Sequence, residues 1–199
     1  MITIIDYGMG NLGNVKKAFT FIGAEAKIAF HRDEIRHAEK LVLPGVGSFG
    51  KAMSILRRSG LHKIIVEMAH KNIPILGICL GMQLFMERGE EGGKNVGLGL
   101  IPGTVKRFEV DLKIPHVGWN QLRIRNGTTL LKDIPDGSYF YFVHSYHAVP
   151  SSSEHILSTT DYGIEFVSGL GKDNIFGFQF HPEKSQKYGL QILKNFVAL

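Results

Sequence analysis

The first eighty residues alternate short apolar runs with amphipathic stretches, and this alternation constrains the fold more than any other feature of the chain. Such a pattern is typical of parallel strands joined by crossover helices. Val, Ile and Leu dominate the runs, which predicts strands buried on both faces of a sheet. The expected strands are residues 2–6, 25–30, 40–43 and 74–78. Helices are expected at 13–22 and over 48–70, the latter as one or two helices broken near Gly60.

From Gly92 onward the sequence pattern changes to short strand-like runs separated by turn residues, as in GLGLIPGTVKRFEV and SYFYFVHSYHAV. This change predicts a strand-rich and partly antiparallel second half. The segment 185–197 is expected to form a closing helix. Its apolar stripe is predicted to consist of Leu190, Leu193 and Val197, with Phe196 beside it.

Composition favours one domain over residues 1–199, because a chain of this length with 44% hydrophobic residues can bury a single core. The only cysteine, Cys79, excludes an intrachain disulfide and indicates a reducing cytoplasm. The start MITIIDYG has no basic leader, and no eighteen apolar residues run uninterrupted, so we expect a cytoplasmic protein with no membrane partner. The net charge of +5 comes from scattered Lys and Arg, which favours solvated surface over nucleic-acid binding.

An early glycine motif offers one functional hypothesis. Gly8, Gly10 and Gly13 in DYGMGNLG form a literal G-x-G-x-x-G between an expected strand and an expected helix, and Asp33 follows about 20 residues later. This spacing is that of a dinucleotide-binding oxidoreductase. The rest of the chain, however, lacks a second half like the first. A tight glycine turn, which lets a loop and a helix approach closely, is the alternative that we favour.

The segment Gly77-Ile78-Cys79-Leu80-Gly81 is the cysteine version of a nucleophile elbow. It follows the expected strand PILGI and precedes a helical pattern, MQLFMER. Flanking glycines are needed because a Cβ there would collide with the neighbouring strand or helix. Cys79 is then a candidate nucleophile, and the amide of Leu80 is a candidate oxyanion donor. A buried structural cysteine remains the alternative for this segment taken alone.

A second motif, His181-Pro182-Glu183, decides between these two interpretations. It follows NIFGFQF, an alternating strand with Phe176, Phe178 and Phe180 on one face. A cysteine nucleophile needs a base, and a carboxylate two residues after the histidine suits a group that orients the imidazole. The sequence therefore predicts a Cys79, His181 and Glu183 triad.

The other histidines do not suggest a metal centre. His31, His37, His62 and His70 occur in polar contexts typical of the surface. His144 and His147 have a spacing similar to that of metal ligands, but residues three apart on one strand face opposite ways. We expect no metal and no cofactor.

Taken together, Pro44-Gly45-Val46-Gly47, GICLGMQLF and HPEKS resemble the triad-type (class I) glutamine amidotransferases, over the whole length of the chain. Within that group PGVGSFG, HVGWN at 116–120 and YFVHSY at 141–146 are similar to the glutaminase subunits of imidazole glycerol phosphate synthases, which act in histidine biosynthesis. The implied fold is α/β, a flavodoxin-like doubly wound sheet with an antiparallel, strand-rich extension. The implied activity is hydrolysis of glutamine through a cysteine thioester.

The resemblance also implies roles for residues around the triad. An oxyanion hole would be formed by amides of Leu80 and of the Val46–Gly47 region. The implied substrate-binding residues are Gly45, Gln83, Glu91, Ser145 and Tyr146. Residues implied to face a partner subunit, with the last four on one face, are Asn11, Asn14, Trp119, Asn120, Tyr141 and Lys184. Trp119 and Tyr141 have an alternative role as core aromatics.

The implied partner is a barrel-type cyclase subunit of imidazole glycerol phosphate synthase, in a heterodimer. We expect it to be a separate chain, because these 199 residues contain no eightfold strand–helix repeat. Two alternatives remain within the same fold: a free-standing cysteine hydrolase and an amidotransferase subunit of another pathway. A non-catalytic binding module is a third, and the intact triad argues against it.

Overall fold

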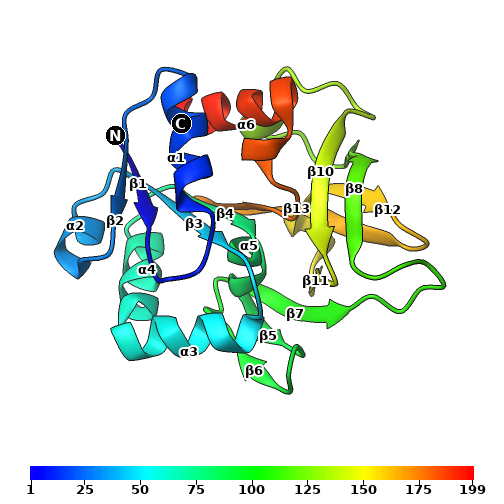
Figure 1. The fold of residues 1–199 in the computed structure, drawn as a ribbon, viewed down its shortest axis with the longest axis horizontal. Helices are drawn as coiled ribbons and strands as arrows, with labels where there is room; N and C mark the ends of the chain where they lie inside the picture. Colours follow the sequence, from blue (N-terminus) through cyan, green and yellow to red (C-terminus); the bar gives the residue numbers. More distant parts are fainter.

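Parallel strands form one half of a large mixed sheet in the computed structural model, which describes all 199 residues (Figure 1). Five strands pair in parallel in the order β2-β1-β3-β4-β14, which is the flavodoxin-like order. Their bounds are β1 Ile2–Ile5, β2 Ala26–Ala29, β3 Lys40–Gly45, β4 Ile75–Cys79 and β14 Ile175–Phe178. The predicted α/β class and the first four predicted strands are therefore confirmed.

The same sheet continues through a largely antiparallel extension, β13-β11-β7-β5-β6, with β12 and β9 attached beside β13. A separate two-stranded sheet, β8 with β10, lies over this half (Figure 1). The bounds are β5 Met86–Gly89, β6 Asn95–Val96, β7 Ile101–Arg107, β8 His116–Gln121, β9 Arg123–Ile124, β10 Tyr139–His144, β11 Tyr146–Pro150, β12 Ile156–Asp161 and β13 Glu165–Lys172. The prediction of a partly antiparallel second half is confirmed.

Helices cover both faces of the parallel half, with α1 and α6 on one face and α3 and α4 on the other (Figure 1). The helices are α1 Leu12–Phe21, α2 Arg32–Arg36, α3 Phe49–Ser59, α4 Leu61–His70, α5 Leu80–Leu84 and α6 Gln186–Ala198, and 3₁₀ turns span Thr129–Leu131, Ser153–His155 and Pro182–Lys184. Gly60 separates α3 from α4 with a left-handed φ of 72°, as its sequence position predicts. None of these helices combines the length and the apolar character that a membrane crossing requires.

The sheet separates two apolar cores, because successive residues of a strand point to opposite faces. In β1, Ile4 packs with α1 and α6, whereas Ile5 packs with α3 and α4. Strand β2 departs from the expectation of burial on both faces, since three of its four residues are partly exposed. It is the last strand of the sheet and has a neighbour on one side only.

Two further expectations are corrected by the fold. The helical pattern MQLFMER ends early: α5 stops at Leu84, and Met86–Gly89 forms β5, which pairs with β7. Strand pairing and complete burial of Met86 outweigh local helix propensity there. In α6 the fully buried stripe consists of Ile192, Leu193 and Phe196, whereas Leu190 and Val197 are only partly buried. The helix is thus rotated slightly from the predicted orientation.

The close packing of β3 against the turn between β4 and α5 predicts the effect of one substitution. A Cβ on Gly81 would lie 1.7 Å from the backbone oxygen of Leu43. Since a backbone atom cannot yield as a side chain does, Gly81→Ala should lower the free energy of unfolding by about 3 kcal/mol or more. The measurement is urea denaturation at equilibrium.

Gly13→Ala is the matched control, because a Cβ on this residue of α1 meets nothing within 4 Å. It should leave stability unchanged or raise it by roughly 0.5 kcal/mol, since Ala has the higher helix propensity. Equal denaturation midpoints and slopes for Gly81→Ala and the parent would contradict the packing argument.

Candidate active site

The nucleophile position is a strained turn at the carboxyl end of β4. Cys79 has φ 54° and ψ −111°, a conformation that L-residues rarely adopt, and α5 begins at the next residue. Strain of this kind costs on the order of 1–3 kcal/mol and persists only where the surroundings enforce it. Gly77 and Gly81 provide the space, since a Cβ on Gly77 would lie 2.5 Å from the Phe85 ring. The predicted need for flanking glycines is confirmed.

His181 reaches Cys79 because β14 is the parallel neighbour of β4, with Phe178 opposite Ile78. The chain therefore leaves both strands at the same edge of the sheet. His181 Nδ1 lies 2.8 Å from Glu183 Oε1, and the two side chains are only 3% and 1% exposed. A carboxylate accepts, so Nδ1 carries the proton. His181 Nε2 makes no hydrogen bond within the protein, and it is free to exchange a proton with Cys79 or with a reactant.

The charge state of His181 is determined by three neighbouring influences. Burial acts to lower its pKa, but the hydrogen bonds and charges of Cys79 and Glu183 outweigh burial and raise the pKa of His181 to about 10. The imidazolium is thus favoured when the cysteine is a thiolate. A thiolate–imidazolium pair is the reactive form of a cysteine nucleophile.

Strand β10 holds His181 in place through the backbone of Tyr141. The amide of His181 donates to the Tyr141 carbonyl at 2.9 Å, and the amide of Tyr141 donates to Ser185 Oγ at 3.0 Å. The Ser185 hydroxyl in turn donates to the carbonyl of His181 at 2.7 Å. The position of the candidate base is therefore tied to the two-stranded sheet.

A cavity of about 420 Å³ opens beside Cys79 and His181. Most of the residues that the sequence predicts for the oxyanion hole and for glutamine binding line it together: Val46, Gly47, Leu80, Gln83, Glu91, Ser145 and Tyr146. Gly45 is not among the lining residues; it pairs with Cys79 in the sheet, and a Cβ on it would lie 2.5 Å from the Tyr7 hydroxyl. The cavity also includes residues that the sequence analysis did not single out for it: Ser48, Pro115, Val143 and His144.

Two polar side chains of this cavity are already engaged within the protein. The amide nitrogen of Gln83 donates to the carbonyl of Tyr146 and to Gln179 Oε1, both at 2.9 Å. Glu91 Oε2 accepts from the backbone amide of Phe49 at 2.7 Å, at the start of α3. Gln83 thus joins α5 to the opposite cavity wall, and Glu91 joins its loop to the segment that follows Val46–Gly47.

The segment Pro44–Gly47 packs against the early glycine loop. A Cβ added to Gly10 would lie 3.5 Å from Pro44, and a Cβ added to Gly47 would lie 2.8 Å from Met9 Cε. Gly47 has φ 103°, and the Val46 side chain is 45% exposed. The structure thus agrees with the interpretation of DYGMGNLG as a tight turn for close approach, and the strand order is not that of a dinucleotide-binding fold.

Sequence reasoning missed two groups that contact or surround the nucleophile. Gln179 Nε2 donates to Cys79 Sγ at 3.6 Å, and the buried Tyr7 lies under the elbow with an unpaired hydroxyl. Burial, and then the charge of Cys79, raise the pKa of Tyr7. Gln179 had a signal in the sequence: it is the polar residue between Phe178 and Phe180 and so faces away from them, towards the elbow.

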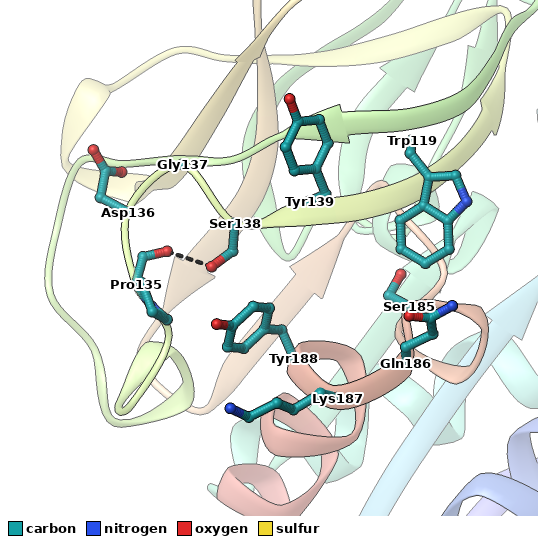
Figure 2. Close-up of a pocket in the computed structure, with 10 residues that line it drawn as sticks. All are labelled: Trp119, Pro135, Asp136, Gly137, Ser138, Tyr139, Ser185, Gln186, Lys187 and Tyr188. Carbon is teal, nitrogen blue, oxygen red and sulfur yellow. Dashed lines mark hydrogen bonds between the residues drawn. The ribbon is translucent and has the colours of Figure 1, made fainter.

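Three of the predicted interface residues converge on one exposed surface. The rings of Trp119 and Tyr141 meet edge to face at 6.1 Å, and Lys184 Nζ lies 5.5 Å from the Tyr141 ring centre. Trp119 is 46% exposed and borders a hollow of about 490 Å³ between the two-stranded sheet and α6 (Figure 2). Figure 2 shows its indole above Ser185 and Gln186. An exposed Trp does not fit the alternative of a core aromatic.

Asn120 does not share this surface, so the prediction that it lies on one face with Trp119 is wrong. Consecutive strand residues point to opposite faces, and Asn120 Nδ2 donates instead to the carbonyl of Asp161 at 2.8 Å. Asn11 and Asn14 lie at the start of α1, where Asn11 Oδ1 accepts from the amide of Asn14 at 3.3 Å.

His144 and His147 are not on one strand, contrary to the sequence analysis. Ser145 separates β10 from β11, and both histidine rings pack against Phe108, at 5.2 Å and 4.7 Å. No group of three or more His, Cys, Asp or Glu side chains is placed to hold a metal ion.

The elbow, the hydrogen-bonded His–Glu pair and the cavity beside them define a cysteine-dependent hydrolase of the nucleophile-elbow type. The chain matches the family model "Glutamine amidotransferase class-I" over residues 3–199, and it belongs to this family.

Full-length relatives make the comparison more specific. The chain is 49% identical to "Imidazole glycerol phosphate synthase subunit HisH" of Moorella thermoacetica, over 100% of this chain and 94% of the relative. It is 50% identical to the HisH subunit of Caldanaerobacter subterraneus, over 98% and 97% of the two chains. It is also similar in fold to PurLQS from Thermotoga maritima, with a TM-score of 0.79 and 17% identity over 99% of this chain and 97% of that one.

Proposed function

We propose that this chain is the glutaminase subunit of imidazole glycerol phosphate synthase, acting as one domain over residues 1–199. The observation that carries the proposal is the buried 2.8 Å contact between His181 and Glu183 beside Cys79, in a chain about half identical to HisH subunits. Substrate glutamine would enter the cavity of about 420 Å³ that Cys79 borders. The ammonia released would pass to a cyclase subunit that makes imidazole glycerol phosphate and AICAR in histidine biosynthesis.

The chemistry follows from the three triad side chains. Cys79 Sγ attacks the side-chain carbonyl carbon of glutamine, and the carbonyl electrons move to oxygen. His181 Nε2 then gives its proton to the departing nitrogen, so that ammonia leaves and a glutamyl thioester remains. His181 next takes a proton from water, which attacks the thioester and releases glutamate. Glu183 holds Nδ1–H and keeps Nε2 directed at the reacting atoms.

The oxyanion formed in each attack needs hydrogen-bond donors. We assign this role to the amide of Leu80, the first residue of α5, and to the Val46–Gly47 region across the cavity. Gly45, Gln83, Glu91, Ser145 and Tyr146 are assigned to glutamine binding. Gly45 would provide close backbone approach, because a Cβ there has no room.

The proposed partner is a barrel-type cyclase chain in a heterodimer, in the cytoplasm, without membrane or nucleic acid. The docking surface would include Asn11, Asn14, Trp119, Tyr141 and Lys184, and the exposure of Trp119 supports this assignment. Asn120, which is half-buried and donates to the carbonyl of Asp161, would support this surface from the other face of β8. A free-standing hydrolase would not require a docking surface. The glutaminase activity of an amidotransferase from another pathway would not rise when the cyclase of imidazole glycerol phosphate synthase is added.

Docking also offers a means of control. The early glycine loop carries Asn11 and touches Pro44–Gly47, so a partner bound at this loop can bias the oxyanion segment directly. Glycines on both sides of Val46 let the peptide unit turn at little steric cost. In one orientation of this peptide unit its N–H group points into the cavity as an oxyanion donor. The partner can favour that orientation only by as much as it binds it more tightly than the other.

The nucleophile assignment predicts that Cys79→Ala abolishes glutamine-dependent synthesis by the complex. Ammonia supplied in the medium should still drive the cyclase reaction at the parent rate, because that reaction needs no thiol. The measurement is product formation with each nitrogen source. Glutamine turnover by Cys79→Ala near the parent level would show that the nucleophile is elsewhere.

Partner control predicts that glutamine hydrolysis is slow for the isolated chain and faster with the cyclase and its nucleotide substrate. The rise should be ~100- to 1,000-fold, because that is the effect of one oxyanion donor on the rate. Trp119→Ala should lose most of this rise. Phe21→Ala is the control, since Phe21 is 79% exposed at the far end of α1. The assay is steady-state glutamate release by chain alone, with partner, and with partner plus nucleotide. Equal rates in all three would refute partner control.

A further inference from the structure

A chain of hydrogen bonds through two buried histidines leads from Asn120 to the wall of the candidate active site. Asn120 Nδ2 lies 3.3 Å from His116 Nε2, and His116 Nδ1 lies 3.1 Å from His144 Nε2. His144 Nδ1 lies 2.8 Å from the carbonyl oxygen of Tyr146. Both imidazoles are buried, and neither takes part in the triad. The chain joins β8 to the end of β10 and to the first residue of β11.

The direction of every bond in this chain follows from its last acceptor. A carbonyl can only accept, so His144 Nδ1 carries a proton and donates to Tyr146. Burial lowers the pKa of His144 to about 3 and that of His116 to about 4, so both rings are neutral at neutral pH. His144 Nε2 therefore has no proton and accepts from His116 Nδ1. His116 Nε2 accepts from Asn120 in turn.

The surroundings hold this arrangement rigidly. The His116 ring stacks on Tyr162 at 4.0 Å and on Phe142 at 4.9 Å between ring centres. Asn120 is fixed by its second donor bond, to the carbonyl of Asp161, and by its oxygen, which accepts from the Gln121 amide at 2.8 Å. Every polar atom of the two rings has one partner, which leaves a single consistent pattern of protons.

This chain of hydrogen bonds ends on the part of the cavity wall that is assigned to glutamine binding. His144 spans the turn that contains Ser145, and the Tyr146 carbonyl that it holds also accepts from Gln83 at 2.9 Å. Gln83 continues to Gln179, whose amide nitrogen donates to Cys79 Sγ. The Tyr146 carbonyl therefore has two donors, one from α5 and one from His144, whereas the neighbouring Ser145 carbonyl accepts from the amide of Phe108 at 3.0 Å.

We propose that His116 and His144 are positioning residues for glutamine, which fix the Ser145–Tyr146 wall through a one-way hydrogen-bond chain that starts at Asn120. The inference rests on the proposed function. The hydrogen-bonded histidines support the binding wall and reach Cys79 only through other residues: Gln83 and Gln179 on one side, and on the other the Val143 carbonyl, which accepts from Cys79 Sγ at 3.9 Å. Loss of this support should therefore weaken glutamine capture more than the chemical step. Positioning through a supporting hydrogen bond is the way outer residues tune a site.

The proton pattern is tested without any assay of activity. Nitrogen chemical shifts of the imidazoles, measured by NMR on the isotopically labelled chain at neutral pH, distinguish the two tautomers. Both His116 and His144 should be neutral and protonated at Nδ1, whereas a free neutral imidazole favours Nε2. A proton on Nε2 of either ring, or a positively charged ring, would overturn the proposal.

The positioning role is tested by matched variants in the complex with cyclase and nucleotide. His116→Phe keeps a stacked ring and removes the hydrogen bonds to Asn120 and to His144. It should raise KM for glutamine about tenfold and change kcat less than about twofold, because only the lost bond to His144 supports the binding wall. His116→Asn keeps a donor near the Nδ1 position and should restore most of the parent KM.

His147→Phe is the control, because His147 packs on the same Phe108 but its Nδ1 has no partner and it stands outside the chain. It should leave KM and kcat at parent values. An unchanged KM in His116→Phe, or equal increases in His116→Phe, His116→Asn and His147→Phe, would reject the positioning role. A parent complex that does not hydrolyse glutamine would instead reject the proposed function, while the tautomers would still be measured.

Discussion

The close approach of the β4–α5 turn to β3 is the constraint on which the site depends. Only glycine fits at position 81, against the backbone of Leu43, and only glycine fits at position 77, against the Phe85 ring. This packing holds Cys79 in its strained, positive-φ conformation, and α5 starts at the next residue. The strain at Cys79 is balanced by the two apolar cores that hold the strands on either side.

Strand β10 and its partner β8 link the chemistry to the surface. The backbone of Tyr141 receives the amide of His181 and donates to Ser185, while the Tyr141 ring lies between Trp119 and Lys184 on the outside. The opposite face of β8 carries His116 and Asn120, which connect through His144 to the Tyr146 carbonyl at the cavity wall. A small displacement of this two-stranded sheet would therefore move both His181 and the Ser145–Tyr146 wall of the cavity.

Much of the fold was predictable because its signals are local. Apolar runs marked the parallel strands, Gly60 marked the break between α3 and α4, and the glycines around Cys79 marked the elbow. The errors arose where distant partners decide the structure. Residues 86–89 have a helical pattern, but pairing with β7 makes them a strand. Asn120 is next to Trp119 in the sequence, but strand geometry turns its side chain to the other face of β8, where it donates to the carbonyl of Asp161. Likewise, the buried histidine chain joins β8, β10 and β11, which no periodicity within one segment reveals.

The central claim is that Cys79 carries the glutamyl group during turnover. It is tested most directly by acid-quenching the complex of this chain with the cyclase and nucleotide during steady-state hydrolysis of glutamine, followed by intact-mass and peptide mass spectrometry. The account predicts that the chain gains the mass of one glutamyl group on the peptide that contains Cys79, and that Cys79→Ala gains none. A modified peptide elsewhere in the chain, or the same adduct in Cys79→Ala, would contradict it.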